Sequence, residues 1–421
     1  MKSGWAASAA LLLAAPLAAQ NGGASPEQVA EAALEAAPVW DGHNDVPIQL
    51  RGRYGNVLES FDFRDTSDAA PLEGSEAGMQ TDIRRLREGK VGAQFWSVYV
   101  SADLPEPEAV QATIEQIDVT KRLIARYPQE LALALGSQDV ERAIAEGKIA
   151  SLIGMEGGHS IGSSLAVLRQ MYALGARYLT LTHSKNTPWA DSATDAPAHD
   201  GLTDFGRQLV REMQRIGMLV DLSHVSEATM TDALDVAQAP VIFSHSGARA
   251  VNGHARNVPD AVLARVKQNG GIVMVVGYPS YLSEELRQWS ALRQAEEARL
   301  KALWLGQPES VTAGLESWVA AHPAPKASAS DMADHIDHIR QVAGIDHIGI
   351  GGDYDGMASG PAGMEDVTGY PALFAELARR GYSREDLEKI ASRNMMRVLR
   401  AAEAYAAAHA SDPPIETTVA D

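Results

Sequence analysis

Four histidines and three carboxylates lie where β-like segments of the sequence end, and these are side chains that bind divalent metal ions. They are His43, Asp45, Glu156, His183, His224, His245 and Asp353. Residues i and i+2 of a strand point to the same side, so His43 and Asp45 can chelate one cation together. A buried ring of imidazoles and carboxylates is electrostatically costly unless a cation or paired hydrogen bonds compensate it. The pattern therefore indicates a metal site.

Zinc is the ion that imidazole and carboxylate ligands commonly hold in catalytic sites. The sequence contains no cysteine, which excludes thiolate ligands, a cysteine nucleophile and disulfides. Three histidines and two carboxylates suit two ions if Glu156 bridges them, with His43 and Asp45 on one ion and His224 and His245 on the other. Two ions about 3.5–4 Å apart lower the pKa of a shared water and polarise a carbonyl, which is hydrolytic chemistry. The zincin motif H-E-x-x-H is absent, which excludes a thermolysin-like site.

The elements that must position these residues alternate between β-like and helical segments. The predicted strands are Val39–Asp45, Val91–Val100, Ala150–Glu156, Ala176–His183, Met218–His224, Pro240–Ser246, Gly271–Val276 and His347–Asp353. The amphipathic segments between them are 82–88, 109–127, 164–174, 203–215, 226–237, 260–268 and 332–343, with a helical lead-in at 26–37 and a helical tail at 371–408. Eight β-then-α units predict a closed TIM-type (β/α)8 barrel in the α/β class. A doubly wound open sheet competes, but no Gly-rich dinucleotide turn follows the first strand.

The chain of 421 residues fits one barrel domain over residues 20–410, with additions before, within and after it. Residues 1–19 form a short positive region, an apolar stretch and a small-residue cleavage site, which predicts a signal peptide and a periplasmic or secreted protein. Residues 282–330 are long for a βα connection and predict an inserted lid. Residues 411–421 contain two prolines and little apolar content, so a loose tail is expected. The net charge of −19 argues against nucleic-acid and membrane-surface partners.

Seven separated motifs, in order from about Val39 to Arg400, resemble those of the renal or membrane dipeptidase family, a zinc branch of the amidohydrolase barrels. They are Asp41-Gly42-His43-Asn44-Asp45, Gly154-Met155-Glu156-Gly157, residues 179–184 with 186–191, Asp221-Leu222-Ser223-His224, Ser244-His245-Ser246, Arg256-Asn257-Val258-Pro259-Asp260 and Gly351-Gly352-Asp353-Tyr354-Asp355-Gly356. The resemblance implies a metallodipeptidase with a barrel fold.

The resemblance also implies a role for each matching residue. His43, Asp45, Glu156, His224 and His245 match the ligands of two Zn²⁺ ions, and Glu156 matches the bridge between them. His183 matches a contact to the scissile carbonyl oxygen, and Arg256 matches the contact to the free C-terminal carboxylate of the substrate. Asp353 matches the acid/base that takes a proton from the water and returns it to the leaving amine. The implied reaction is attack of a metal-bridging hydroxide on the peptide bond of a dipeptide.

Further implications concern the substrate and the assembly. The family accepts a D-residue at the C-terminal position of the dipeptide. It also forms dimers, and a homodimer of this chain would lack an intersubunit disulfide because Lys185 stands where mammalian relatives carry cysteine. The C-terminus lacks the apolar tail that a glycolipid anchor requires, so no membrane anchor is expected.

Other functions compete with this interpretation. Another binuclear-metal amidohydrolase would act on a non-peptide amide or a lactone. Gly158-His159-Ser160-Ile161-Gly162 fits the G-x-S-x-G motif of serine hydrolases, although the predicted strand ends at Glu156, too early for a nucleophile elbow. An exported acidic protein could also be a solute-binding protein, which would have two lobes. His335 and His338, three apart on a predicted helix, are expected on a solvated face.

Overall fold

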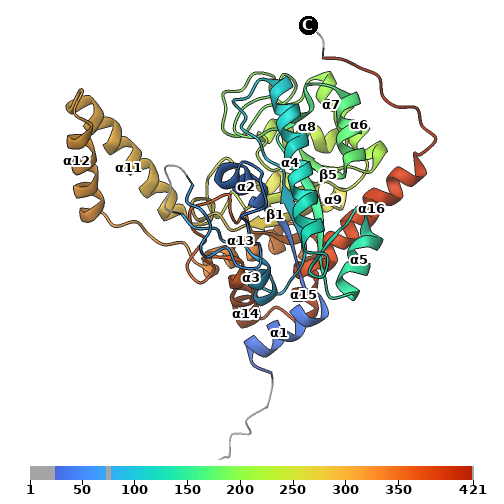
Figure 1. Cartoon of the computed structure of the whole chain (residues 1–421), viewed down its shortest axis with the longest axis horizontal. Coiled ribbons are helices and arrows are strands. Elements are labelled where there is room, and N and C mark those ends of the chain that lie inside the picture. The colour runs from blue at the N-terminus through green and yellow to red at the C-terminus, as the bar shows by residue number, and fades with distance from the viewer. Residues whose placement is uncertain (1–23, 73–76, 420–421) are drawn as a thin grey trace, which may run out of the picture.

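The computed structural model describes residues 24–72 and 77–419, so the predicted signal peptide at 1–19 lies outside the described residues. The chain forms a closed barrel of eight parallel strands surrounded by helices (Figure 1). The (β/α)8 barrel predicted from the sequence is therefore confirmed, and neither the open sheet nor the two lobes of a solute-binding protein is present in the described part of the chain.

All eight predicted strands are present, most of them one to four residues shorter than predicted. They are β1 (Val39–Asn44), β2 (Val91–Ser97), β4 (Ile149–Glu156), β5 (Ala176–Thr180), β6 (Leu219–Asp221), β7 (Ile242–Ser246), β8 (Ile272–Val276) and β9 (Ile348–Gly351). Parallel pairing of β1 with β9 and of β2 with β4 completes the circuit. A short strand that the sequence did not predict, β3 (Leu131–Leu133), pairs with the beginning of β4.

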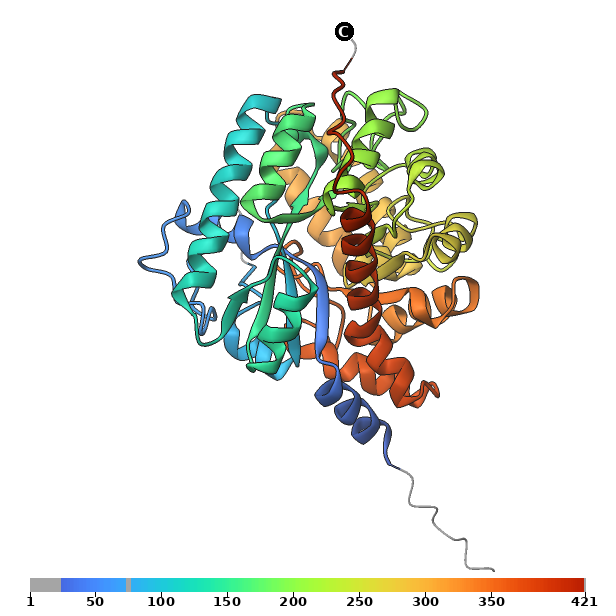
Figure 2. The same cartoon turned by 90° about the vertical axis from the view of Figure 1, so that its right-hand side faces the viewer.

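The helices surround the barrel, and the last long helix, drawn in dark red, crosses the side that faces the viewer in Figure 2. They are α1 (Pro26–Ala36), α2 (Val46–Tyr54), α3 (Ile83–Glu88), α4 (Glu106–Arg126), α5 (Ser137–Ala145), α6 (Leu165–Leu174), α7 (Asp204–Ile216), α8 (Glu227–Val236), α9 (Asp260–Asn269), α10 (Pro279–Leu282), α11 (Glu284–Leu303), α12 (Pro308–Ala321), α13 (Ala329–Val342), α14 (Tyr370–Arg379), α15 (Arg384–Glu388) and α16 (Asn394–Ala408). No helix in the described residues has the length and apolar content needed to cross a membrane.

Helix α7 shows how local sequence sets these elements. The side chain of Thr203 caps its N-terminus by accepting a hydrogen bond from the Gly206 N–H. Gly217, at φ 83°, ends the helix in the left-handed conformation that glycine adopts without steric cost. Phe205, Leu209 and Met213 recur every four residues and are all buried, so one face of the helix packs on the barrel.

Packed side chains close the end of the barrel at which the strands begin. In the barrel interior, Trp40, Phe95 and Tyr178 belong to one apolar cluster with Val398 and Leu399 of α16. Because α16 covers the end where the strands begin, the opposite end, where the strands finish, is the side on which a substrate site can open.

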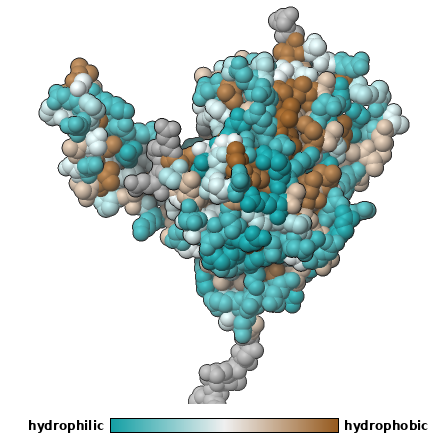
Figure 3. Space-filling view, viewed as in Figure 1, coloured by the Kyte–Doolittle hydropathy of each residue, from teal (hydrophilic) through white to brown (hydrophobic). Residues whose placement is uncertain are grey.

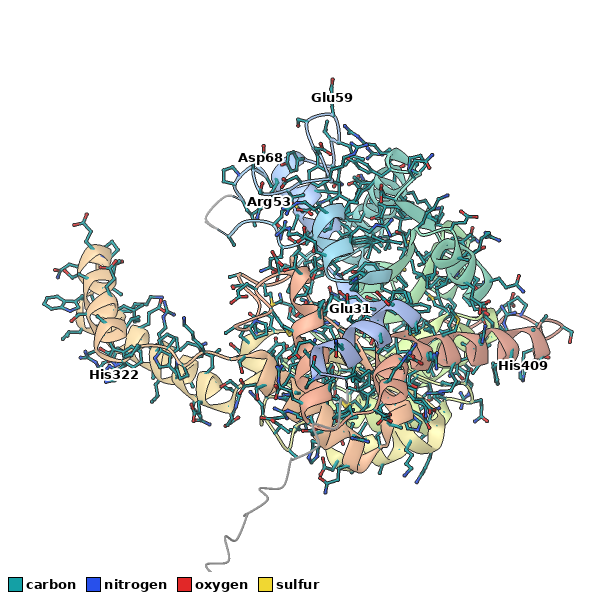
Figure 4. All side chains as sticks on the ribbon, turned by 90° about the horizontal axis from the view of Figure 1, so that it is seen from below. Glu31, Arg53, Glu59, Asp68, His322 and His409 are labelled. Atoms are coloured by element: carbon teal, nitrogen blue, oxygen red, sulfur yellow. The ribbon has the colours of Figure 1, made fainter. Side chains whose placement is uncertain are left out.

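The segment at 282–330 forms an arm that consists of α11 and α12. The sequence predicts a lid here, but the arm stands away from the barrel in two perpendicular views (Figures 1 and 4), and His322, at the end of α12, is labelled on it in Figure 4. The reason is that α11 and α12 lack a buried face that could pack on the barrel, because Leu300 is the only buried residue in these two helices. The segment therefore does not form a lid over the barrel of its own chain, and the prediction of a lid is wrong in this respect.

The C-terminal tail makes specific contacts, whereas the sequence predicted a loose end. The N–H of Ile415 donates to Glu212 Oε2 at 3.1 Å, and Arg169 donates to the carbonyl of Ile415 at 3.2 Å. Thr418 pairs with Ser164 in an antiparallel bridge. Glu212 is fully buried, and a buried carboxylate needs donors. The tail backbone supplies one of them, so the tail is held to the barrel domain at Ile415 and Thr418.

His335 also differs from its predicted environment. It is fully buried, accepts a hydrogen bond at Nδ1 from the Ala248 N–H at 2.8 Å, and contacts the Leu282 carbonyl through Nε2 at 3.1 Å. Burial lowers its pKa to about 4, so the ring is neutral at physiological pH. His335 therefore ties α13 to the loop after β7 and to the end of α10.

Candidate metal centre

The seven residues singled out at predicted strand ends come together at the open end of the barrel. His43 and Glu156 lie within the final residues of β1 and β4, and His245 lies in β7. The other four lie in the turns that follow their strands; they are Asp45, His183, His224 and Asp353. Parallel strands that close into a barrel bring all of their carboxyl ends to one rim, which is why residues 310 positions apart in the sequence, His43 and Asp353, are neighbours.

Glu156 lies at the centre of the cluster, and its two oxygens face different partners. Oε2 is 3.4 Å from His43 Nε2, whereas Oε1 is 2.9 Å from His224 Nε2 and 3.4 Å from His245 Nε2. Asp45 Oδ2 completes the first side, at 3.3 Å from His43 Nε2. Glu156 thus offers one oxygen to His43 and the other to His224 and His245, as a bridging carboxylate does.

The spacing of these atoms fits metal coordination. Two ligand atoms that lie about 2.1 Å from one ion at a tetrahedral angle are about 3.4 Å apart, which matches the contacts of Glu156 and Asp45. His43 Nε2 is buried and has no hydrogen-bond partner among the described residues, so a polar atom of the first group is left unsatisfied without a cation. Three sets of three ligand atoms lie within 4.8 Å of one another: His43/Glu156/His245, Glu156/His183/His224 and His43/Asp45/Asp353.

The protonation equilibria of the cluster reflect its burial. Burial would raise the pKa of Glu156, but the charge of His43 and the hydrogen bond from His224 hold that pKa well below its usual value. Burial lowers the pKa of His224 and of His245 well below 6.5, so both rings are neutral. A neutral imidazole beside an ionised carboxylate is the form that binds a metal ion.

Asp353 is a buried carboxyl group on the turn after β9. Burial raises its pKa to about 8, and the nearby charges of Asp45 and Glu156 act in the same direction. Its Oδ1 is 4.0 Å from His43 Nε2, and its backbone adopts φ 62°. Gly356 allows this close approach, because a Cβ there would lie 2.2 Å from Asp45 Oδ2 and 2.8 Å from Asp353 Oδ1. The turn thus holds a carboxyl group with a raised pKa beside the ligand cluster.

Arg256 is a buried cation that no carboxylate neutralises in the described part of the chain. Its side chain is 1% exposed, and its Nη atoms donate only weakly, to Ser246 Oγ at 3.4 Å and to the carbonyl of His245 at 3.3 Å. Its Nε has no hydrogen-bond partner among the described residues. The ring of Tyr281 faces the guanidinium with 5.4 Å between the ring centre and Cζ. A buried guanidinium with free donors is suited to bind an anion.

A cavity of about 450 Å³ joins the ligand cluster to Arg256. It is lined by Glu156, His183, His224, Arg256 and Asp353, and also by three tyrosines that the sequence did not single out: Tyr99, Tyr278 and Tyr281. Tyr99 packs on His183, with ring centres 4.6 Å apart. Tyr99 lies in the loop after β2, near the end of the predicted second strand, but tyrosine is not among the metal-binding residue types that marked the other strand ends. Tyr278 and Tyr281 lie at α10, where no spacing pattern could have revealed them. No residue of α11 or α12 lines this cavity.

The serine of the G-x-S-x-G motif does not form a catalytic triad. Ser160 is buried, and its hydroxyl donates to the carbonyl of Gly157 at 2.6 Å. The adjacent His159 contacts the Val100 carbonyl at 3.1 Å instead. No histidine ring contacts the Ser160 hydroxyl within the described residues, so a base to activate this serine is not in place.

Comparisons with known proteins agree with this geometry. A family model described as membrane dipeptidase (peptidase family M19) matches residues 27–412. Dipeptidase 3 of Macaca fascicularis is 42% identical over 392 residues, which cover 92% of this chain and 70% of that protein. The probable dipeptidase PvdM from Pseudomonas aeruginosa has a TM-score of 0.77 at 24% identity and covers 90% of this chain and 99% of its own. A metallo peptidase from Rhodobacter sphaeroides, solved with a phosphinate mimic of the dipeptide L-Ala-D-Ala, has a TM-score of 0.69 at 23% identity, with coverages of 87% and 99%. At these identities the two solved structures show the shared fold.

Proposed function

The chain belongs to the membrane dipeptidase family, peptidase family M19, and is a metallodipeptidase; from this premise we propose which residues bind and cleave the dipeptide. The observation that carries the proposal is the position of Arg256, a buried cation without a carboxylate partner in the described residues, in the same cavity as the ligand cluster. A guanidinium there can form two hydrogen bonds with the free C-terminal carboxylate of a dipeptide. It thereby fixes the distance from the carboxylate to the bond that is cleaved.

Five residues would hold two zinc ions, with His43, Asp45 and Glu156 on one and Glu156, His224 and His245 on the other. The opposed oxygens of Glu156 and the absence of cysteine from the sequence support this assignment. When bound, the ions supply Lewis acidity, which lowers the pKa of water and polarises a carbonyl group.

Asp353 then transfers the proton, and His183 stabilises the developing negative charge. Asp353 takes a proton from the attacking water as the carbon–oxygen bond forms, and returns it to the amine nitrogen as the carbon–nitrogen bond breaks. Burial lowers the pKa of His183 to about 4, so its ring is neutral and can donate one hydrogen bond to the oxyanion. Its Nε2 is 3.7 Å from Glu156 Oε1, which places the ring at the edge of the ligand cluster.

The substrate class that we propose includes dipeptides with a D-residue at the C-terminal position. The metallo peptidase from Rhodobacter sphaeroides, bound to a phosphinate mimic of L-Ala-D-Ala, supports this extension. We also propose that residues 1–19 export the protein to the periplasm or the medium and that the mature catalytic domain begins near residue 20.

A hydrolysis panel tests the proposed recognition. We expect zinc-loaded protein to cleave dipeptides with a free C-terminal carboxylate and to cleave the corresponding C-terminal amides at least about tenfold more slowly, since one charge-assisted hydrogen bond is worth about 1.5–3 kcal/mol. The panel varies the stereochemistry of each residue and adds tripeptides, a non-peptide amide and a lactone. Equal rates on the acid and the amide would contradict the role of Arg256, and faster cleavage of the lactone or the non-peptide amide would favour a different amidohydrolase activity.

The arm supports a proposal about assembly: two copies associate through the groove between α11 and α12. Of the two helices, only Leu300 is buried, so the arm has almost no core within one chain. A groove of about 910 Å³ on the arm contains Trp304, Leu305 and Leu315. In Figure 3 the visible face of the arm is mostly hydrophilic or intermediate in colour, with a small brown group at its upper tip. The charged residues that line the groove are Arg293, Glu297, Lys301 and Glu316.

The charges of the groove favour a second copy as its occupant. The four charged lining residues sum to zero, whereas the whole chain carries −19. Two copies therefore approach at this surface with little of the repulsion that their other faces produce. A patch that carries both signs can also be complementary to itself across a two-fold axis, as isologous dimers require.

Exposed leucines on the arm allow a matched test of this association. Leu305 lines the groove and is 79% exposed, whereas Leu292 is 62% exposed and lies outside the groove. Neither side chain supports the fold of one chain, so Leu305→Asp should convert the dimer to a monomer and Leu292→Asp should leave the dimer unchanged. Light scattering coupled to size-exclusion chromatography measures the masses. A wild-type monomer, or a dimer that survives Leu305→Asp, would contradict the proposal.

A further inference from the structure

A chain of hydrogen bonds leads from a buried carboxylate to one of the candidate metal ligands. Asp221 ends β6, and Ser244 and His245 are adjacent residues of β7. The hydroxyl of Ser244 lies 2.7 Å from Asp221 Oδ2 and 2.8 Å from His245 Nδ1. All three side chains are buried, so solvent does not compete for these hydrogen bonds.

The direction of each hydrogen bond follows from the donors around Asp221. Its Oδ1 accepts from the N–H groups of Ser223 at 3.1 Å and Ser244 at 2.8 Å. Its Oδ2 accepts from the hydroxyls of Ser244 and of Thr180, the latter at 2.5 Å. With four donors directed at its two oxygens, the side chain of Asp221 acts as an acceptor only.

The single hydroxyl hydrogen of Ser244 is therefore directed to Asp221. The serine oxygen then has only lone pairs to offer to His245, so Nδ1 of the imidazole must carry the hydrogen and donate it. The other ring nitrogen, Nε2, is left without a hydrogen in the neutral ring. It faces Glu156 Oε1 at 3.4 Å and His224 Nε2 at 3.0 Å, inside the ligand cluster.

We propose that Asp221 is a positioning residue that acts through Ser244 to fix the tautomer of His245 and to present its bare Nε2 to the cation. The proposal rests on the metal site described under Proposed function. No comparable hydrogen bond fixes the tautomer of His43, on the other side of Glu156. Its Nδ1 lies 2.9 Å from the hydroxyl of Tyr178, which can either donate or accept. The two halves of the centre thus differ in how firmly the protein sets the protonation of the ligand.

Two hydroxyl deletions separate this role from a structural one. Ser244→Ala and Thr180→Val each remove one hydroxyl donor to Asp221 Oδ2, but only Ser244 contacts a histidine. We expect Ser244→Ala to weaken zinc binding by 10- to 100-fold, the usual effect of losing a partner of a metal-bound histidine. We expect Thr180→Val to leave it unchanged. Equilibrium dialysis of the metal-free proteins against zinc measures both, and equal losses in the two variants would overturn the proposal.

Nitrogen NMR of the histidine rings tests the tautomer directly, without metal. In the metal-free wild type, His245 should show a protonated Nδ1 and an unprotonated Nε2. In Asp221→Asn the amide can donate to Ser244, which turns the serine hydrogen toward Nδ1 and moves the ring hydrogen to Nε2. A protonated Nε2 in the wild type would overturn the proposal. A wild type that shows the expected tautomer but binds no zinc would instead count against the proposed function.

Discussion

Replacing Glu156 by glutamine should eliminate zinc binding at both halves of the centre and reduce dipeptide hydrolysis at least about a thousandfold, which corresponds to about 4 kcal/mol of transition-state stabilisation. The reason is that Glu156 contributes an oxygen to each group of ligand atoms, at 3.4 Å from His43 and at 2.9 Å from His224. The amide keeps the size of the side chain but removes its charge and one acceptor oxygen. Metal analysis and kcat/KM for a dipeptide measure the two effects.

Ser160→Ala is the control for this prediction. Ser160 is buried, follows Glu156 closely in the sequence and belongs to the competing serine-hydrolase motif. Its hydroxyl, however, donates only to the Gly157 carbonyl. We expect this variant to retain its zinc and its activity. A Glu156→Gln protein with normal activity, or a Ser160→Ala protein without any, would show that the metal cluster is not the catalytic centre.

Replacing Asp353 by asparagine should lower kcat by about 10²- to 10⁴-fold, the usual contribution of a general acid/base. Asparagine keeps the shape of the side chain and tolerates the left-handed backbone at φ 62°, so the fold and the zinc content should be retained. Asp355→Asn is the matched control, because Asp355 also lies in the cavity wall and also has a positive φ, of 67°. Its Oδ1 accepts from the Gln80 N–H, which an amide oxygen can replace. Steady-state kinetics that show equal losses in the two variants would contradict the role of Asp353.

The pKa of Asp353 also predicts a pH dependence of stability in the metal-free protein. Burial raises this pKa from 3.8 to about 8, so between these values the folded state holds a proton that the unfolded state has released. The contribution of Asp353 to the free energy of unfolding therefore falls as the pH rises from about 4 to 8. Asparagine does not titrate, so the Tm of Asp353→Asn should rise relative to the wild type across the same range. Thermal melts in the presence of a chelator measure this difference, and a constant difference would mean that Asp353 is ionised when buried.

Much of the barrel could be predicted because its signals are local. Some strands are runs of apolar residues, as in Ile272–Val276, and some helices have a cap and an apolar face, as in α7. The sequence predicts where each strand lies along the chain more accurately than the residue at which it ends. His183 and His224 were placed at the ends of strands, but they lie in the turns that follow β5 and β6, because pairing with neighbouring strands stops earlier. Strand β3, with three residues, was missed because so short a run carries little periodicity.

The sequence by itself determined the residue types that are available for chemistry, their order along the chain and the alternation of strands and helices that places them at one rim. These properties depend on neighbours within a few positions. Only the tertiary structure decided that the two oxygens of Glu156 face different histidines, that Arg256 has no carboxylate partner in the described residues, and that Asp221 reaches His245 through Ser244. It also decided that the arm points away from the cavity and that the tail docks on Glu212. Each of these features depends on atoms from different strands or helices, whose distances are set only when the barrel closes and its side chains pack.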